Sequence, residues 1–162
     1  MKPINQSSLL KQTHYELRGK ISDMANQLIQ QNHDILKLHL GNPGIFNLNA
    51  PTELLDAVSA NLHISQGYCD SKGLLTAREA VVRYNQQQGI SDTHPDRTYI
   101  GSGASELINF ALAALLNPGD EVLLPQPVYP LWSAVTTWNG GKVRFYQCDE
   151  DNDWQPNIEH IE

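Results

Sequence analysis

A tight glycine-rich loop is the first place in the sequence where residue types and spacing could do chemistry. Gly101-Ser102-Gly103-Ala104-Ser105 lies between a short apolar strand and an apolar helix. Free N–H groups and the helix dipole at a helix N-terminus favour an anion, above all a phosphate. Glycines allow close backbone approach, and Ser105 adds a hydroxyl. The pattern predicts a phosphate cup, although a tight turn with Ser105 as helix N-cap explains it equally well.

A dinucleotide site is the main rival interpretation of this loop. The fingerprint G-x-G-x-x-G requires a third glycine where the chain has Glu106. Asp120 and Glu121 lie near the right distance for a ribose-binding acid, but they open the next strand, whereas that acid should close it. The sequence also has no G-x-S-x-G nucleophile elbow. The loop therefore favours a phosphate over a dinucleotide.

Tyr129 is the second candidate, between Pro127 and Pro130 after the carboxyl end of a predicted strand. Ligands of open α/β sheets bind at that edge, and an aromatic ring there could stack on a planar ligand. A core tyrosine in a rigid turn is the simpler explanation. The polar loop 66–73 and the turn at 41–44 are, by residue type alone, solvated turns.

The elements that must position these loops alternate along the second half of the chain. Strand, helix, strand, helix and strand in succession predict a parallel sheet with helices on its faces. The helix between the first two strands is apolar nearly all round, which predicts that it is buried. These predicted elements are a strand ending at Tyr99-Ile100, a helix over 107–116, a strand over 121–124, a helix over 129–138 and a strand over 142–148.

The first hundred residues show weaker signals after an arm over 1–20. Apolar spacing predicts a helix around 21–29, and a short apolar run predicts a strand over 35–40. Asn49 is a candidate cap for a further helix with Pro51 in its first turn. Leu54, Leu55, Val58 and Leu62 form its expected buried face, and another helix over 74–88 should stop at Gly89.

Composition narrows the class of protein. The 162 residues are 40% hydrophobic and 18% charged, as in an ordinary globular domain. No apolar run reaches the length of about 18 residues that a membrane span needs, and no secretory signal is visible at the N-terminus. Two cysteines favour a reduced, cytoplasmic setting, and a net charge of −7 argues against nucleic acid as the partner. The six histidines show no metal spacing.

Five ordered segments together resemble the class I/II aminotransferases of fold type I, and within them the bacterial glutamate–pyruvate (alanine) group. The resemblance covers nearly the whole chain, and the Tyr-Cys-Asp-Ser-Lys-Gly run favours the alanine-type group. The segments are Tyr15-Glu16-Leu17-Arg18-Gly19, Leu38-His39-Leu40-Gly41-Asn42-Pro43, Gly67-Tyr68-Cys69-Asp70-Ser71-Lys72-Gly73-Leu74, Gly103-Ala104-Ser105-Glu106-Leu107-Ile108 and Tyr129-Pro130-Leu131-Trp132.

The resemblance implies pyridoxal 5'-phosphate as cofactor, with amino acids and 2-oxo acids as substrates, and a homodimer in the full-length protein. Gly103, Ala104 and Ser105 would hold the cofactor phosphate. Tyr129 would stack on the pyridine ring, and Tyr68 would reach the phosphate held by the neighbouring subunit. On the substrate side, the resemblance implies Gly41, Tyr15 and Arg18.

The implied fold is α/β: a partial fold-type-I arrangement, with a parallel-type sheet covered by helices. Residues 1–48 would form the N-terminal arm and the start of the small domain, and residues 49–162 the first part of the large cofactor-binding domain. None of the six lysines matches the family's Schiff-base lysine, so no catalytic residue is assigned. We therefore expect an N-terminal fragment that is inactive and sticky or oligomeric when isolated.

Three alternatives remain open at this stage. A fold-type-I lyase or decarboxylase would share the phosphate loop and Tyr129. A truncated product could act only as a binding or dimerisation module. A dinucleotide-binding module is the third, and the preferred amino acid stays undetermined.

Overall fold

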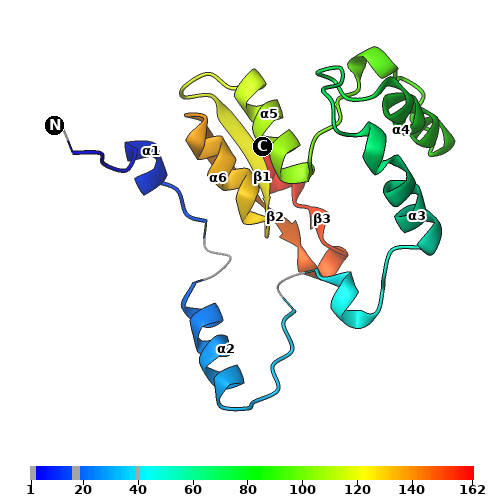
Figure 1. Ribbon diagram of the computed structural model, residues 1–162. Coiled ribbons are helices and arrows are strands. Elements are labelled where there is room, and N and C mark those ends of the chain that lie inside the picture. The colour runs from blue at the N-terminus through cyan, green and yellow to red at the C-terminus, as the bar shows by residue number, and fades with distance from the viewer. Residues whose placement is uncertain (1–2, 16–18, 39–40) are drawn as a thin grey trace. The chain divides into compact units, whose positions relative to one another are not determined.

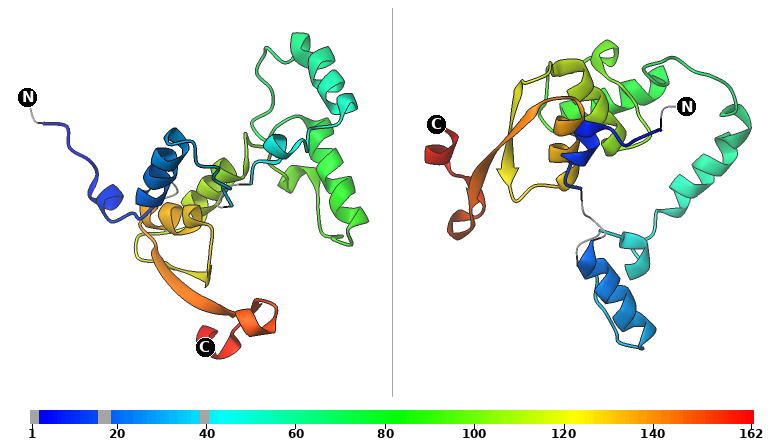
Figure 2. Two further views of the ribbon diagram at one scale, coloured as in Figure 1. Left: turned by 90° about the horizontal axis from the view of Figure 1, so that it is seen from below. Right: turned by 90° about the vertical axis from the view of Figure 1, so that its left-hand side faces the viewer.

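The computed structural model describes residues 3–15, 19–38 and 41–162. The chain divides into two compact units, which Figures 1 and 2 show in three orientations. The first unit comprises Met1–Asp23 and Gly101–Glu162, and the second comprises Met24–Ile100. Over the described ranges, none of the helices has the length and apolar character to cross a membrane.

The first unit is built on a small sheet of β1 (Glu121–Gln126), β2 (Lys142–Asp149) and β3 (Gln155–Pro156), in the order β1-β2-β3. Strands β1 and β2 pair in parallel, from Glu121 opposite Lys142 to Gln126 opposite Gln147. Parallel neighbours need a crossover, which α6 (Pro130–Trp138) supplies. The predicted strand–helix–strand unit is confirmed. The short antiparallel β3 was not predicted.

The core of the first unit lies between α5 (Ala104–Leu115) and α6. Leu112, Leu131 and Val135 are buried there, and Ile108, Leu116 and Trp132 pack around them. Helix α6 also contacts β1, β2 and the short α1 (Ser8–Lys11), while α7 (Ile158–Ile161) contacts β2. The predicted burial of α5 on all sides is wrong: 57% of Phe110 and 74% of Leu115 are exposed, because no described element covers that face.

The second unit holds α3 (Thr52–Asn61) and α4 (Leu75–Gln87), together with 3-10 turns at Pro43–Phe46, Leu62–Ile64 and Pro95–Arg97. Helix α2 (Lys20–Gln30) begins in the first unit and continues into the second. Helix α4 ends as predicted, with Gly89 at a φ of +84°. A further 3-10 turn, Glu150–Asn152, follows β2 in the first unit.

Four predictions for the second unit are wrong. Residues 35–38 and 99–100 form no strand, and residues 39–40 lie outside the described residues. Pro51, not Asn49, occupies the N-cap of α3. The expected buried face of α3 is exposed, with 55% of Leu54 and 56% of Val58 accessible. Apolar periodicity locates such a face correctly on a helix, but burial needs a partner element, and none among the described residues packs on this face.

Candidate functional site

The N-terminus of α5 keeps its backbone donors unpaired. Gly103 occupies the N-cap with extended backbone, and no side chain caps the helix. The Glu106 carboxylate turns back and accepts the Ser102 N–H at 2.6 Å. The amides of Gly103, Ala104, Ser105 and Glu106 donate to no other described residue. Four free N–H groups therefore remain at the positive end of α5, where they favour an anion.

Ser105 lies inside the first turn of α5 rather than at its cap. The alternative interpretation of the loop, a tight turn capped by Ser105, is therefore wrong. The hydroxyl of this exposed residue forms no hydrogen bond within the described part of the chain. It is consequently available, together with the neighbouring amides, to a ligand. We call the set Gly103, Ala104 and Ser105 the phosphate cup.

The two glycines of the loop have different steric roles. A Cβ at Gly101 would lie 2.8 Å from both Glu106 Oε2 and Leu107 Cδ2, so a side chain there would displace the Glu106 carboxylate from its place on the loop. A Cβ at Gly103 would meet nothing within 4 Å. Open space beside unpaired donors at a helix N-terminus fits a phosphate group.

Tyr129 and Tyr15 meet although 114 residues separate them in sequence. Their hydroxyl oxygens lie 3.3 Å apart, and the Tyr15 ring packs edge-on against Trp138, with ring centroids 6.5 Å apart. Both tyrosines are partly exposed, at 46% for Tyr129 and 38% for Tyr15. Sequence reasoning missed Trp138, whose only signal was an aromatic residue closing a predicted helix.

The phosphate cup and Tyr129 lie at the same end of the first unit. The turns that follow α5 and α6 are joined by a hydrogen bond from the Gly119 N–H to the Gly140 carbonyl at 2.8 Å. Both helices therefore finish at the same end of the unit, and both begin at the other, beside the carboxyl end of β1, as Figure 1 shows. This is the edge at which open α/β sheets bind ligands.

The other predicted site residues are not brought to this edge within the first unit. Tyr68 and Gly41 belong to the second unit, where both are exposed. Arg18 lies outside the described residues. Sequence reasoning also missed Arg78, a charged side chain buried in the second unit, because an arginine within a polar helix is ordinary in sequence. Within the described ranges, no group of histidine, cysteine, aspartate and glutamate residues could hold a metal ion.

A helix N-terminus with free amides and an aromatic ring, both at the carboxyl edge of a parallel sheet, is the arrangement of a fold-type-I pyridoxal-phosphate enzyme. The sequence model of aminotransferase class I and II matches residues 33–162, and the chain belongs to that family. Members of this family depend on pyridoxal 5'-phosphate, and the free donors of the phosphate cup suit its phosphate.

Individual relatives agree with this assignment. The chain is 48% identical over 161 residues to the glutamate-pyruvate aminotransferase AlaA of Haemophilus influenzae, covering 99% of this chain and 40% of the relative. A crystal structure of an aminotransferase from Escherichia coli superposes with a TM-score of 0.89 at 46% identity, covering 98% of this chain and 39% of that one. The alanine aminotransferase of Pyrococcus furiosus gives 0.88 at 29% identity, over 97% of this chain and 40% of its own. The chain thus spans about 40% of the length of the relatives it matches.

Proposed function

We propose that this chain is the N-terminal portion of a pyridoxal-phosphate-dependent aminotransferase. The whole protein would transfer an amino group between alanine or glutamate and the 2-oxo acids pyruvate and 2-oxoglutarate. The observation that carries the proposal is the set of unpaired amides at the start of α5, on the sheet edge where Tyr129 lies. The names of the relatives, which include a glutamate-pyruvate aminotransferase and an alanine aminotransferase, support the substrate class.

In the first unit, the phosphate cup would bind the cofactor phosphate. The amides of Ala104 and Ser105 would donate to it together with the Ser105 hydroxyl, and the α5 dipole would add to the attraction. Tyr129 would stack on the pyridine ring, with its hydroxyl oriented by Tyr15. When bound, the cofactor supplies the electron sink that allows an amino acid to lose its α-proton.

The remaining predicted residues would act on the substrate or on a second copy. Gly41 would contact the substrate carboxylate through its backbone, and Tyr15 and Arg18 would border the substrate pocket. Tyr68 would reach the cofactor phosphate held by the partner in a homodimer. Exposed apolar faces on α3 and α5 support self-association of the isolated chain. Sizing chromatography checks this, and a sharp monomer peak with cooperative melting would contradict it.

We also propose a cytoplasmic location. Its support is that both cysteines of the chain, Cys69 and Cys148, are free thiols, as a reducing compartment favours. Fractionation of cells that express the tagged protein tests it, and recovery from an exported fraction would contradict it.

We propose that no lysine of this chain holds the cofactor covalently, and the positions of two described lysines support this. Lys142 begins β2, opposite the first residue of β1, so it lies at the far end of the sheet from Tyr129. The length of β1 alone puts about 17 Å between these two ends. The Lys72 ammonium belongs to the second unit and donates to the Asp96 carbonyl at 2.7 Å. We therefore propose that the isolated chain has no transaminase activity.

Cofactor absorbance combined with reduction tests both parts of the proposal. The pure chain is mixed with pyridoxal phosphate, scanned in the visible region, reduced with borohydride and weighed by intact mass spectrometry. We expect the chain to bind pyridoxal phosphate weakly and to form no covalent adduct, and we expect Ser105→Ala to reduce this binding. A stoichiometric adduct at one lysine, or turnover of alanine with 2-oxoglutarate, would show that this chain is an enzyme by itself. If Ser105→Ala leaves the affinity for pyridoxal phosphate unchanged, the proposed role of the phosphate cup is wrong.

A further inference from the structure

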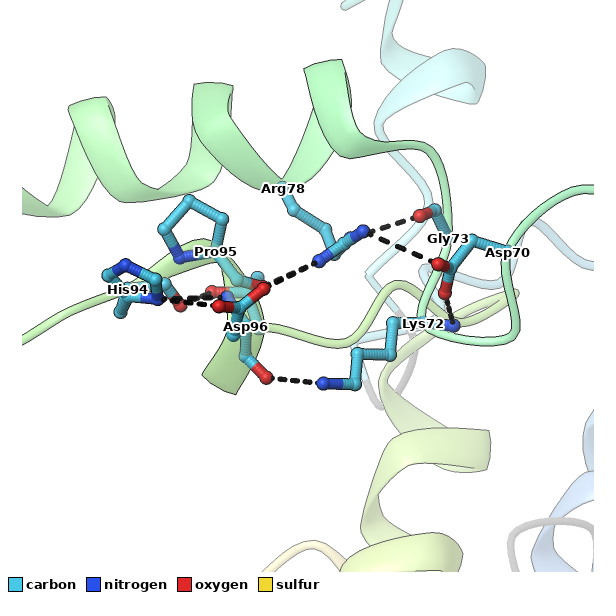
Figure 3. Close-up of polar contacts among 8 residues, drawn as sticks. Asp70, Lys72, Gly73, Arg78, His94, Pro95 and Asp96 are labelled. Atoms are coloured by element: carbon cyan, nitrogen blue, oxygen red, sulfur yellow. Dashed lines mark hydrogen bonds and ion pairs between the residues drawn. The ribbon is translucent and has the colours of Figure 1, made fainter.

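Arg78, in the first turns of α4, is the one charged residue in the described part of the chain that is buried, with 5% of its surface exposed. Its Nε donates to the Gly73 carbonyl at 3.0 Å and its Nη1 to the Pro95 carbonyl at 2.9 Å. The Asp70 and Asp96 carboxylates lie 3.8 and 4.0 Å from its Nη2 and Nη1. Figure 3 shows the guanidinium between these groups. Burying a guanidinium is unfavourable unless it is paired in this way, so its contacts hold the surrounding loops in one arrangement.

The loop on one side of Arg78 is a tight turn over residues 70–73. The Asp70 side chain accepts the Lys72 N–H, and the Asp70 carbonyl accepts the Gly73 N–H, both at 2.8 Å. Gly73 has a φ of +94°, and a Cβ there would lie 2.6 Å from Ile100 Cβ. Only glycine therefore fits at this position of the turn, close against Ile100.

A second set of contacts ties this turn to the segment that follows Pro95. The Lys72 ammonium donates to the Asp96 carbonyl at 2.7 Å and lies 5.5 Å from the centre of the Tyr99 ring. The Ile100 N–H donates to the Lys72 carbonyl at 2.8 Å. Arg78 lies between the two segments and is the only described residue whose side chain donates to both, through the carbonyls of Gly73 and Pro95. We call this group of contacts the Arg78 clamp.

Tyr68 stands two residues before the clamped turn and has no side-chain support of its own. Its side chain is fully exposed and forms no hydrogen bond or ring contact with another described residue. The backbone direction at Asp70 consequently sets where Tyr68 points. We propose that Arg78 is a positioning residue, which fixes the turn over residues 70–73 and thereby holds Tyr68 in reach of a cofactor phosphate. The target of Tyr68 rests on the proposed function; the clamp itself does not.

Hydrogen exchange of the full 162-residue chain tests the clamp directly. Arg78→Met removes both donors, and Arg78→Lys keeps the charge but cannot span two carbonyls with one fixed fork. Arg83→Met is the matched control, because Arg83 is exposed on the same helix and pairs with no described residue. The probes are the amides of Lys72, Gly73 and Ile100, with Gly119 and Gly141 as references in the first unit.

In Arg78→Met, exchange at the three probe amides should accelerate about tenfold or more, because local opening no longer breaks the guanidinium contacts. The reference amides and Arg83→Met should match the parent chain. Unchanged exchange at all three probes would overturn the clamp. If Arg78→Met fails to fold, Arg78→Lys carries the test: a smaller acceleration confined to the probes supports the clamp, and none overturns it.

A double-substitution cycle on pyridoxal-phosphate affinity separates positioning of Tyr68 from general support of the fold. Tyr68→Phe and the folded Arg78 variant should each weaken binding about tenfold, and the combined variant should bind no more weakly than Tyr68→Phe alone. Normal binding by the Arg78 variant, or a combined loss of about a hundredfold, would show that Arg78 does not act through Tyr68. If Tyr68→Phe and Ser105→Ala both bind pyridoxal phosphate as tightly as the parent does, the proposed function and the role given to Tyr68 are both wrong. The hydrogen-exchange experiment tests the Arg78 clamp independently of that outcome.

Discussion

Two polar, glycine-containing loops, each leading into a helix, have opposite hydrogen-bond states. In the loop over residues 101–106, one carboxylate takes one N–H, and four amides at the start of α5 stay unpaired. In the turn over residues 70–73, the amides of Lys72 and Gly73 and their carbonyls are all engaged. Unpaired donors at a helix start can bind a ligand, whereas backbone groups that are already paired hold a turn in shape. The first loop is therefore suited to binding and the second to positioning.

The difference comes from where the acidic side chain stands relative to the helix. Glu106 is the third residue of α5 and folds back to Ser102, outside the helix. Asp70 precedes α4 and pairs inside its own turn, while Arg78 from α4 takes the Gly73 carbonyl. The same residue types thus leave one loop open to a ligand and close the other.

The largest expected effect is on the closed turn. Gly73→Ala should lower the free energy of unfolding by about 3 kcal/mol, because a side chain there is strained at positive φ and overlaps Ile100. Gly89→Ala is the matched control: Gly89 has a φ of +84° but no neighbour within 4 Å. It should cost only about 1 kcal/mol. Urea titration followed by circular dichroism measures both, and equal losses would mean that the contact with Ile100 is not a constraint.

The next effect is on the open loop. Ser105→Ala should weaken pyridoxal-phosphate binding about tenfold, because one hydroxyl donor to a charged phosphate is lost. Its melting temperature should stay that of the parent, since the Ser105 hydroxyl bonds to no described residue. Ser102→Ala, in the same loop, is the control that should bind normally. Isothermal titration calorimetry measures the affinity for pyridoxal phosphate. A lower melting temperature without a change in affinity would show that Ser105 stabilises the fold and does not bind the phosphate.

A smaller effect concerns the one hydrogen bond that shapes the open loop. Glu106→Leu should cost about 1 kcal/mol, because the Ser102 N–H loses its acceptor. Glu106→Gln retains an acceptor oxygen and should stay close to the parent. Thermal melting compares the three chains. A Gln variant as unstable as the Leu variant would show that charge, and not the hydrogen bond, holds the loop.

The smallest effect is a pH dependence at the turn between α5 and β1. The Asn117 N–H and side-chain amide donate to the Asp120 carboxylate and lower its pKa below the ordinary 3.8. A lowered folded pKa stabilises the fold above the ordinary value, and this contribution is lost as the pH falls through the folded pKa. The melting-temperature gap between the parent and Asp120→Asn should therefore be constant at pH values well above 3.8 and shrink as the pH falls below that ordinary value.

Asp151→Asn provides the control for this titration, because the Asp151 carboxylate accepts no hydrogen bond from a described residue. It should show no such pH-dependent gap. A gap for Asp120→Asn that persists unchanged in acid would mean that the turn depends on the shape of the side chain and not on its charge.

Much of the element order could be predicted because the signals are local. Glycine and proline punctuation and helical periodicity located α4, α6, β1 and β2 within a few residues. The absent strands at 35–38 and 99–100 show where such signals stop. A short apolar run is a strand only if a partner strand pairs with it, and that partner is not a local property. The predicted burial of the apolar face of α3 is wrong for the same reason, because burial also requires a partner element.

The family, the glycine-rich loop and the aromatic residue after β1 were specified by residue order alone, because short motifs and their order along the chain are enough to recognise them. Which donors stay free, and which are consumed, was decided by tertiary structure. Arg78 reaches Pro95 across 17 residues, and Tyr15 reaches Tyr129 across 114. Whether a polar group is paired depends on what the fold brings within about 3 Å of it, and no local pattern in the chain encodes that distance.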